Sequence, residues 1–308
     1  MLDMEAAKRT LTERLLARMP EAGNYTTAIE GVGIHRRDNP DSPEHCFRVP
    51  RIVKIVQGQK RSLVGAEEFL YGDDDVFIAG VEMPNTSNVL TASPDKPIMS
   101  FTVDLDKNLI GQLALEIGET ALDESGSGTG ILVQRATPLI MDAFLRLEAL
   151  LDRPDDIPVM SSLIIKELHF RVLTGPGGQT LRMLHTYGSQ KNHITRAIAW
   201  LRENFKERIA IEDLAEKAHM APTTFHRHFR EVTSVSPLQY QKRLRLHEAQ
   251  RLMLLYDMDA GGASDAVGYE SLTQFNREYK RLFGEPPRRN VTRWLREHAD
   301  VSADLVND

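Results

Sequence analysis

Two fifteen-residue segments of similar pattern lie fifty positions apart in the second half of this 308-residue chain. The first copy, TTFHRHFREVTSVSP, spans residues 223–237, and the second, TQFNREYKRLFGEPP, spans residues 273–287 and aligns with it without a gap. Each copy has an aromatic pair at an i, i+4 spacing, Phe225 and Phe229 or Phe275 and Tyr279, which falls on one face of a helix. A shorter helical segment precedes each copy. Each copy therefore predicts a helix, a tight turn and a second helix.

The helix face opposite each aromatic pair carries side chains that suit contacts with DNA bases. A recognition helix places its N-terminal residues in the major groove. Arginine there reads guanine, and asparagine or glutamine reads adenine, each through two hydrogen bonds. The side chains on this face are, in chain order, Thr223, His226, Arg227, Gln274, Asn276 and Arg277. The sequence therefore predicts two helix-turn-helix motifs, at residues 211–232 and 260–283.

Helical hairpins of an ordinary bundle, with solvated charge outside, are the alternative explanation of one such copy. The presence of two copies favours DNA binding, because Arg227 and Arg277 occupy the same outward position. A helix expected over residues 237–254 is then a rigid spacer between the motifs. The helices expected in this half span residues 191–205, 211–218, 222–232, 237–254, 260–267, 271–283 and 287–297.

The charge of the chain divides in the same way. The net charge is -6, but residues 1–190 hold 19 basic and 27 acidic residues, whereas residues 191–296 hold 19 basic and 13 acidic residues. A basic half beside an acidic half points to a nucleic-acid-binding half. A chance fluctuation in solvated charge is the alternative explanation.

The first half of the chain has a different pattern. Residues 24–105 alternate short apolar runs with turn signals, which predicts an all-β sandwich or small barrel. Residues 138–151 and 159–173 then repeat apolar residues at helical spacing, and residues 1–20 predict an amphipathic helix. We expect an α+β chain of two domains, 1–187 and 188–308. The broad apolar stripe around Leu147 predicts that the helix pair of residues 138–173 forms a dimer interface.

A family resemblance follows from the residues of the second half. LAEKAHMAPTTFHRHFREVTSVSPLQYQKRLRLHEAQRLML and AVGYESLTQFNREYKRLFGEPP resemble the AraC/XylS family of bacterial transcription regulators over about residues 191–290. The resemblance implies base-reading positions at Thr223, His226, Arg227, Leu272, Thr273, Gln274, Asn276 and Arg277. Arg230 and Lys280, nearer the middle of their helices, are the candidates for contacts with DNA phosphates. The turn at residues 218–221 departs from the family because it lacks a glycine that is often present there.

The first half resembles the N-terminal domain of one AraC subfamily. The residues that carry this resemblance are HCFRVPRIVKIVQGQKRSLVG (45–65) and FLYGDDDVFIAGVEMP (69–84). The resemblance implies a cupin-like β-barrel followed by two helices, a small-molecule effector, a homodimer, and contact with promoter DNA and RNA polymerase, as in an activator. The sequence itself does not decide whether transcription rises or falls. Candidate effector-lining residues are Phe47, Tyr71, Phe77, Met83, Met99 and Phe101, and ordinary core packing is the alternative for each.

Neither a cofactor nor a metal site is expected. The side chains that suit a metal in the first half, which are His35, His45, Cys46, His169 and His185, lack metal-ligand spacing. No nucleophile elbow or phosphate-binding loop occurs in the sequence, so no catalytic residue is predicted. The leading hypothesis is an effector-controlled regulator. The alternatives are a constitutive regulator whose barrel only dimerises, and a cupin-type enzyme tethered to DNA.

The composition favours a cytoplasmic protein. The sequence has no apolar run of about 18 residues, so we expect no membrane span. The first 20 residues include acids and lack an apolar core, so we do not expect a signal peptide. Cys46 is the only cysteine, which excludes an intrachain disulfide.

Overall fold

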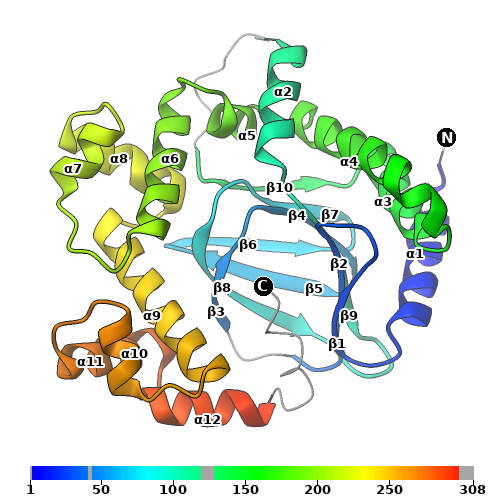
Figure 1. Ribbon diagram of the computed structural model, residues 1–308. Helices are drawn as coiled ribbons and strands as arrows, with labels where there is room; N and C mark the ends of the chain where they lie inside the picture. Colours follow the sequence, from blue (N-terminus) through cyan, green and yellow to red (C-terminus); the bar gives the residue numbers. More distant parts are fainter. Residues whose placement is uncertain (1, 41–43, 119–127, 298–308) are drawn as a thin grey trace.

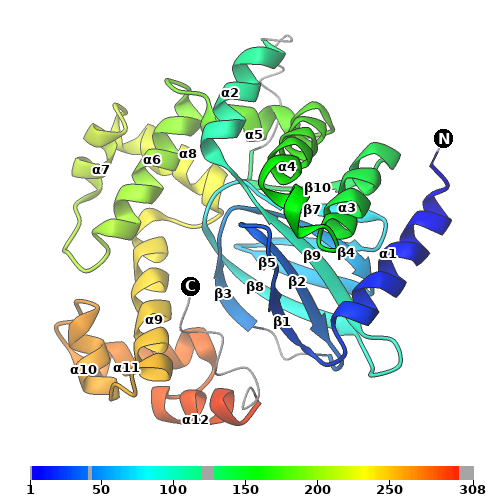
Figure 2. The ribbon, with the colours of Figure 1, turned by 45° about the vertical axis from the view of Figure 1, so that its right-hand side comes forward.

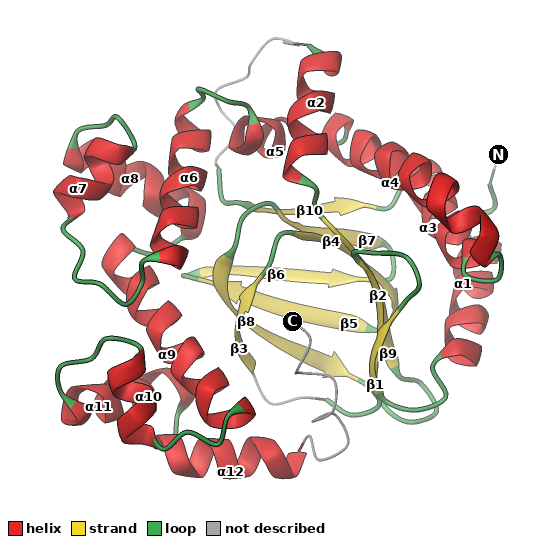
Figure 3. Ribbon diagram, in the orientation of Figure 1, coloured by secondary structure: helices red, strands yellow, loops and turns green. Residues whose placement is uncertain are grey.

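Two antiparallel sheets face each other in the N-terminal half of the chain, and helices form the C-terminal half (Figure 1, Figure 3). This computed structural model describes residues 2–40, 44–118 and 128–297. The first sheet has six strands in the order β1-β2-β9-β4-β7-β10, and the second has four in the order β3-β8-β5-β6. The strands are β1 (Gly23–Thr26), β2 (Val32–Arg37), β3 (Glu44–Arg48), β4 (Arg51–Gln57), β5 (Gln59–Val64), β6 (Glu67–Gly72), β7 (Asp75–Ala79), β8 (Met83–Thr91), β9 (Ile98–Asp104) and β10 (Ile131–Arg135). The two-domain α+β prediction is confirmed.

The faces of the six-stranded sheet differ because side chains alternate along each strand. Phe101 of β9 points to the helices, and its ring lies 5.3 Å from that of Phe144. Phe77 of β7 points to the second sheet, where it stacks on Tyr71 of β6 at 4.5 Å. The face that carries Phe101 is covered by α1 (Met4–Arg18), α3 (Pro138–Leu150) and α4 (Ile157–Thr174), as Figure 2 shows.

The helices of this half include the predicted pair, the predicted N-terminal helix α1 and three further elements. The predicted segments 138–151 and 159–173 correspond to α3 and α4, which are joined by the short 3-10 helix η1 (Pro154–Asp156). The sequence did not predict α2 (Lys107–Ile117) or α5 (Gly178–His185). Asp106 caps the first turn of α2 directly after β9. Gly178 is the first residue of α5, and a side chain at this position would lie 2.3 Å from the Leu173 carbonyl oxygen. The glycine therefore allows the helix to start close to the preceding backbone.

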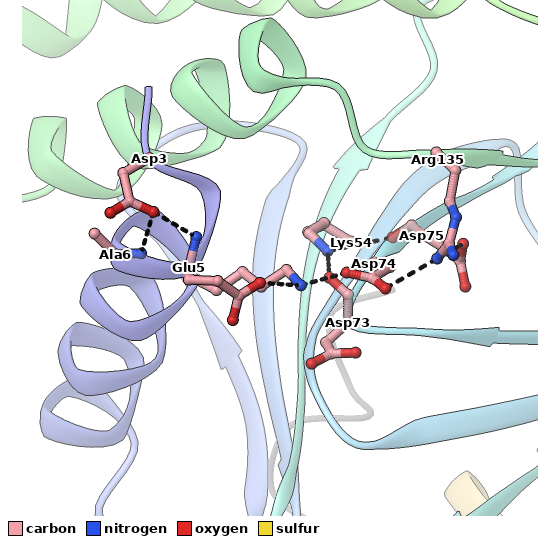
Figure 4. A network of polar contacts seen from close by, with 9 residues as sticks. Asp3, Glu5, Ala6, Lys54, Asp73, Asp74, Asp75 and Arg135 are labelled. Carbon is pink, nitrogen blue, oxygen red and sulfur yellow. Dashed lines mark hydrogen bonds and ion pairs between the residues drawn. The ribbon is translucent and has the colours of Figure 1, made fainter. Parts of the chain in front are cut away.

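A network of charged groups fixes α1 to the rim of the six-stranded sheet (Figure 4). The Lys8 ammonium contacts both Glu5 of its own helix and Asp74 of the β6–β7 turn. Arg135 of β10 contacts Asp74 from the other side at 3.0 Å. Lys54 lies fully buried beneath, donating to the carbonyl oxygen of Asp73, and burial lowers the pKa of Lys54 to about 8.

The C-terminal half consists of seven helices within the described residues, and their ends agree with the predicted ends to within two residues. They are α6 (Gln190–Glu203), α7 (Ile211–Lys217), α8 (Pro222–Thr233), α9 (Pro237–Leu255), α10 (Ala260–Ala266), α11 (Leu272–Phe283) and α12 (Pro287–Glu297). Figure 1 shows α9 running between the α7–α8 pair and the α10–α11 pair. Among the residues that the structure describes, no helix has the length and apolar character required to cross a bilayer.

The two facing sheets, called the barrel below, pack directly on the α7–α8 helix pair. The Gly130 N–H donates to the carbonyl oxygen of Val232, near the end of α8, at 2.9 Å. The Tyr240 hydroxyl of α9 donates to the carbonyl oxygen of Glu82 at 3.0 Å, and the Glu82 carboxylate pairs with Arg202 of α6. One hydrophobic core runs from Ala7 through both sheets to Leu244, and a second runs from Leu246 to Phe283. The α7–α8 pair therefore shares the core of the barrel, and the α10–α11 pair has a core of its own.

Candidate nucleic-acid interface

The first motif is the α7–α8 pair. His219 in its turn adopts the left-handed conformation, with φ of 54°, at the place where the family often has glycine. Histidine is among the few non-glycine residues enriched in this conformation. Pro222 then occupies the first turn of α8, where its fixed φ suits a helix start. The missing glycine is thus replaced by a residue that accepts the same backbone shape.

The second motif is the α10–α11 pair, and its turn is one residue longer. Residues 218–221 join α7 to α8, whereas residues 267–271 join α10 to α11. Gly268 takes the left-handed conformation here, with φ of 82°, and a side chain at this position would meet the Lys206 carbonyl at 2.2 Å. Ser271 caps α11 by accepting from the Gln274 N–H, and Gly284 ends the helix in the left-handed conformation. These local signals explain why the α11 boundaries were predictable from the sequence.

The two second helices expose the same faces. In each, the aromatic pair is fully buried, with ring centroids 5.6 Å apart for Phe225 and Phe229 and 5.5 Å apart for Phe275 and Tyr279. The residues predicted to contact DNA are all exposed: Thr223, His226, Arg227, Arg230, Leu272, Thr273, Gln274, Asn276, Arg277 and Lys280. The fold therefore brings the predicted residues onto two matching outward faces.

Hydrogen bonds orient some of these side chains in the free protein. Arg227 pairs with Glu231, one turn further along α8, at 3.2 Å. Gln274 donates to Glu278 at 3.1 Å, and Glu278 also accepts from Lys242 and from the Tyr269 hydroxyl at 2.8 and 2.9 Å. Partial burial alone would raise the pKa of the Glu278 carboxyl, but the hydrogen bonds from these three donors lower that pKa below its usual range. Glu278 thus connects α9 to α11 as an ionised carboxylate.

Arg245 fixes the second motif to the loop after α6, a role that the sequence did not reveal. Its guanidinium donates to the carbonyl oxygens of Phe205, Lys206, Glu207 and Gly268, at 2.7 to 2.9 Å. Four carbonyl acceptors on one guanidinium explain why a basic residue of the spacer helix is half-buried. The basic residues along α9 are therefore part of the scaffold of the motifs.

The predicted effector-lining residues separate into two groups. Strand alternation directs Tyr71, Phe77 and Met83 into the space between the sheets, and all three are buried. The other three point elsewhere. Met99 and Phe101 lie on the helix-covered face, and Phe47 of β3 points outward to α9, with its ring 5.3 Å from that of Tyr240. Alternation defines which residues share a face, and only the tertiary structure decides which face is inside.

The space between the sheets also contains buried polar side chains that the sequence analysis passed over. The Ser62 and Tyr71 hydroxyls lie 3.0 Å apart, and the Asn85 side-chain nitrogen lies 3.5 Å from Ser62. The three residues are at most 2% exposed. The Asn85 side-chain oxygen is buried and makes no hydrogen bond within the described part of the chain. The described part of the chain contains no group of three or more His, Cys, Asp or Glu side chains placed to hold a metal ion.

Two sequence families match the chain in the order that the fold suggests. Residues 28–180 match the family described as AraC-type transcriptional regulator N-terminus, and residues 214–293 match a helix-turn-helix domain family. This chain belongs to the AraC/XylS family. Members of the family are DNA-binding transcription regulators and not enzymes.

Similar proteins cover the regulator to different extents. An uncharacterized HTH-type transcriptional regulator of Bacillus subtilis, YobQ, is 33% identical over 111 residues, which are 35% of this chain and 46% of YobQ. The HTH-type transcriptional activator RhaS of Escherichia coli O139:H28 is 23% identical over 87% of this chain and 92% of RhaS. The match to YobQ therefore spans less than half of that protein, whereas the match to RhaS spans most of both chains.

A solved structure shares the fold over most of this chain. Wild-type ToxT from Vibrio cholerae, crystallised with an unsaturated fatty acid, superposes with a TM-score of 0.57 at 10% identity. The match covers 84% of this chain and 94% of that one. At this identity the likeness establishes the common fold alone.

The two exposed faces lead to a test of base contact against phosphate contact. On a duplex selected by the wild-type regulator, Arg277→Ala should weaken binding by about 1–3 kcal/mol and relax specificity at one base pair, because a bidentate contact is lost. Lys280→Ala, one turn along the same face, should weaken binding to all sequences alike and reduce the salt slope by about one unit. Fluorescence anisotropy at several salt concentrations measures both. Unchanged affinity of Arg277→Ala at physiological salt would show that the face is assigned wrongly.

Proposed function

We propose that this AraC-type regulator binds promoter DNA through both motifs at once and that a small effector in its barrel controls the binding. The observation that supports this most is the pair of matching exposed faces on α8 and α11. In this proposal, Thr223, His226 and Arg227 read one half of the operator. Leu272, Thr273, Gln274, Asn276 and Arg277 read the other half, and Arg230 and Lys280 contact phosphates. The barrel and its helices, 1–187, serve the effector and the dimer, and 188–308 serve the DNA.

The likeness to the activator RhaS over 87% of this chain supports activation of transcription. We further propose contact with RNA polymerase, which the family resemblance implies, and a cytoplasmic location, which the composition favours. The unequal faces of the two motifs also define the operator. The first face has His226 where the second has Asn276, and Pro222 stands where the second has the exposed Leu272, so the two halves differ in sequence. Two major grooves on one side of the duplex are about 10 bp apart.

Selection from a random duplex pool tests this architecture. We expect the wild-type protein to enrich an asymmetric site, with two unlike halves about 10 bp apart on one face of the DNA. The double variant Asn276→Ala/Arg277→Ala should keep selecting the first half and lose the second. Enrichment of a single short palindrome, read by one motif per chain, would contradict the proposal.

The chemistry between the sheets favours a polar effector. Ser62, Tyr71 and Asn85 are buried there. A buried polar atom without a hydrogen-bond partner costs free energy, and the Asn85 side-chain oxygen is such an atom. A ligand that donates a hydrogen bond to this oxygen would remove that cost. Ser100 and Thr102 face them from the six-stranded sheet and are also buried. A ligand with hydroxyl or amine groups matches this set better than an alkyl chain does.

Thermal unfolding in the presence of a metabolite library tests the effector. A ligand present at a hundred times its Kd stabilises the folded state by about 2.7 kcal/mol, which raises the Tm. We expect a polar, hydroxyl- or amine-bearing compound to raise the Tm of the wild type and to change its operator affinity. Asn85→Leu should lose both responses and stay folded. A regulator whose Tm and operator affinity respond to no compound would be constitutive, with a barrel that serves only the dimer.

The α4 helix provides the surface for a homodimer. Leu147 of α3, in the stripe from which the interface was predicted, is fully buried, so it is core. Val159, Met160 and Leu163, which lie within about one turn of α4, are instead 64%, 40% and 57% exposed. Three neighbouring apolar side chains in water favour association. A twofold interface places this patch against the same patch of a second chain.

A charge at the centre of the α4 patch tests the dimer. Leu163→Glu should bury two like charges in the twofold interface and dissociate it at micromolar concentration. Leu70→Glu, an equally exposed leucine at 53% on β6, is the matched control and should stay dimeric. Sedimentation velocity measures the mass, and circular dichroism checks the fold. A wild type that is already monomeric at this concentration would exclude the interface.

A further inference from the structure

The two motifs are held to the N-terminal half in different ways. The first motif shares the core of the barrel and accepts a backbone hydrogen bond from Gly130. The second motif has a separate core, which begins at Leu246 within α9. Its position relative to the first motif therefore depends on α9 and on whatever side chains bridge the two cores.

Strand β3 provides such a bridge. It is an edge strand of the four-stranded sheet, and its outward side chains meet α9 and α11. The Phe47 ring lies edge-on to the rings of Tyr240 and His247, at 5.3 and 5.1 Å. His247 in turn lies 5.2 Å from Phe283, and His45 approaches Phe283 directly at 6.1 Å. A chain of rings thus connects the barrel edge to the second motif.

The series of ring contacts ends at the second recognition helix. Phe283 is the last residue of α11, and its ring packs on Tyr279 at 4.4 Å. The base-reading positions lie at the opposite end of α11 and are exposed. The β3 contacts therefore hold the helix by its C-terminal end and leave its DNA-binding face open.

His45 and His247, the two histidines in this series of ring contacts, are uncharged at neutral pH. Burial, together with the nearby His45 and Arg243, lowers the pKa of His247 to about 3, and burial followed by Arg243 lowers the pKa of His45. The contact is therefore made by neutral rings, whose edge-to-face packing prefers a defined geometry. Such a contact restricts orientation, unlike a flexible surface ion pair.

We propose that β3 positions the second recognition helix for DNA, with Phe47 as the central positioning residue. The inference rests on the proposed function, in which both motifs bind one operator. A motif that is already held in place loses less freedom on binding, so the complete operator is bound more tightly. The barrel thereby sets the distance between half-sites that the protein accepts.

Removing the Phe47 ring tests this positioning. Phe47→Ala should weaken binding to the complete selected operator about fivefold or more. It should weaken binding to a duplex with a scrambled second half much less, because the first motif keeps its shared core and its hydrogen bond from Gly130. Inserting one base pair between the halves should penalise the wild type strongly and the variant much less. A merely structural defect would not change this spacing profile.

Matched variants complete the experiment. Leu70→Ala removes an outward-facing apolar side chain from β6, the opposite edge strand of the same sheet, and should behave as the wild type. Phe47→Tyr keeps the ring and should restore tight binding. His45→Ala, which removes only the direct contact with Phe283, should reproduce part of the Phe47→Ala effect and serves if Phe47→Ala fails to fold.

Three results would overturn the inference. Equal loss on the complete and half operators would show general damage, no loss on either would show no coupling, and tighter binding by the variant would show that β3 holds the motif away from DNA. A wild type that selects no two-part site would instead refute the proposed function, and the selection experiment shows this before any variant is made.

Discussion

The arrangement of the whole molecule depends on the contacts of one side chain, Tyr240 of α9. Its ring is fully buried and lies edge-on to Phe229 of the first recognition helix at 5.6 Å and to Phe47 of the barrel at 5.3 Å. Its hydroxyl donates to the Glu82 carbonyl, and burial raises its pKa well above the ordinary value, so the donor proton stays in place. Barrel, spacer helix and first motif therefore meet at a single residue with two ring contacts and one hydrogen bond.

This junction changes how the chain divides physically. The predicted boundary at residues 187 and 188 follows a change in sequence pattern and remains a prediction about roles. The hydrophobic cores instead separate between Leu244 and Leu246, inside α9. The sequence pattern therefore changes near residue 188, whereas one hydrophobic core gives way to the other inside α9. In the proposed function, an effector signal from the barrel would reach the first motif through continuous packing and the second motif through α9 and the rings of β3.

The sequence predicted the features that local rules determine. Helix signals such as the caps at Ser236, Ser271 and Gly284 and the prolines at helix starts depend on residues only a few positions apart in the sequence. The predicted helix ends therefore agree closely with the observed ones. The features it missed depend on distant partners. The sequence places Arg245 on the spacer helix but does not reveal its role, because its four acceptors come from segments 23 to 40 residues away. Phe47 was assigned to the wrong side of its strand, because alternation alone does not identify the inner face.

The unequal motifs give the complex a polarity. Because the first motif shares its core with the barrel and the second lies at the far end of α9, the proposed operator would adjoin the barrel of each bound chain at one end only. Inverting the operator would therefore move the bulk of the regulator to the other side of the site. A neighbouring gene on one side would face the barrel, and a gene on the other side would face α12. The orientation of such a site, and not only its base sequence, would then decide which part of the regulator faces a gene.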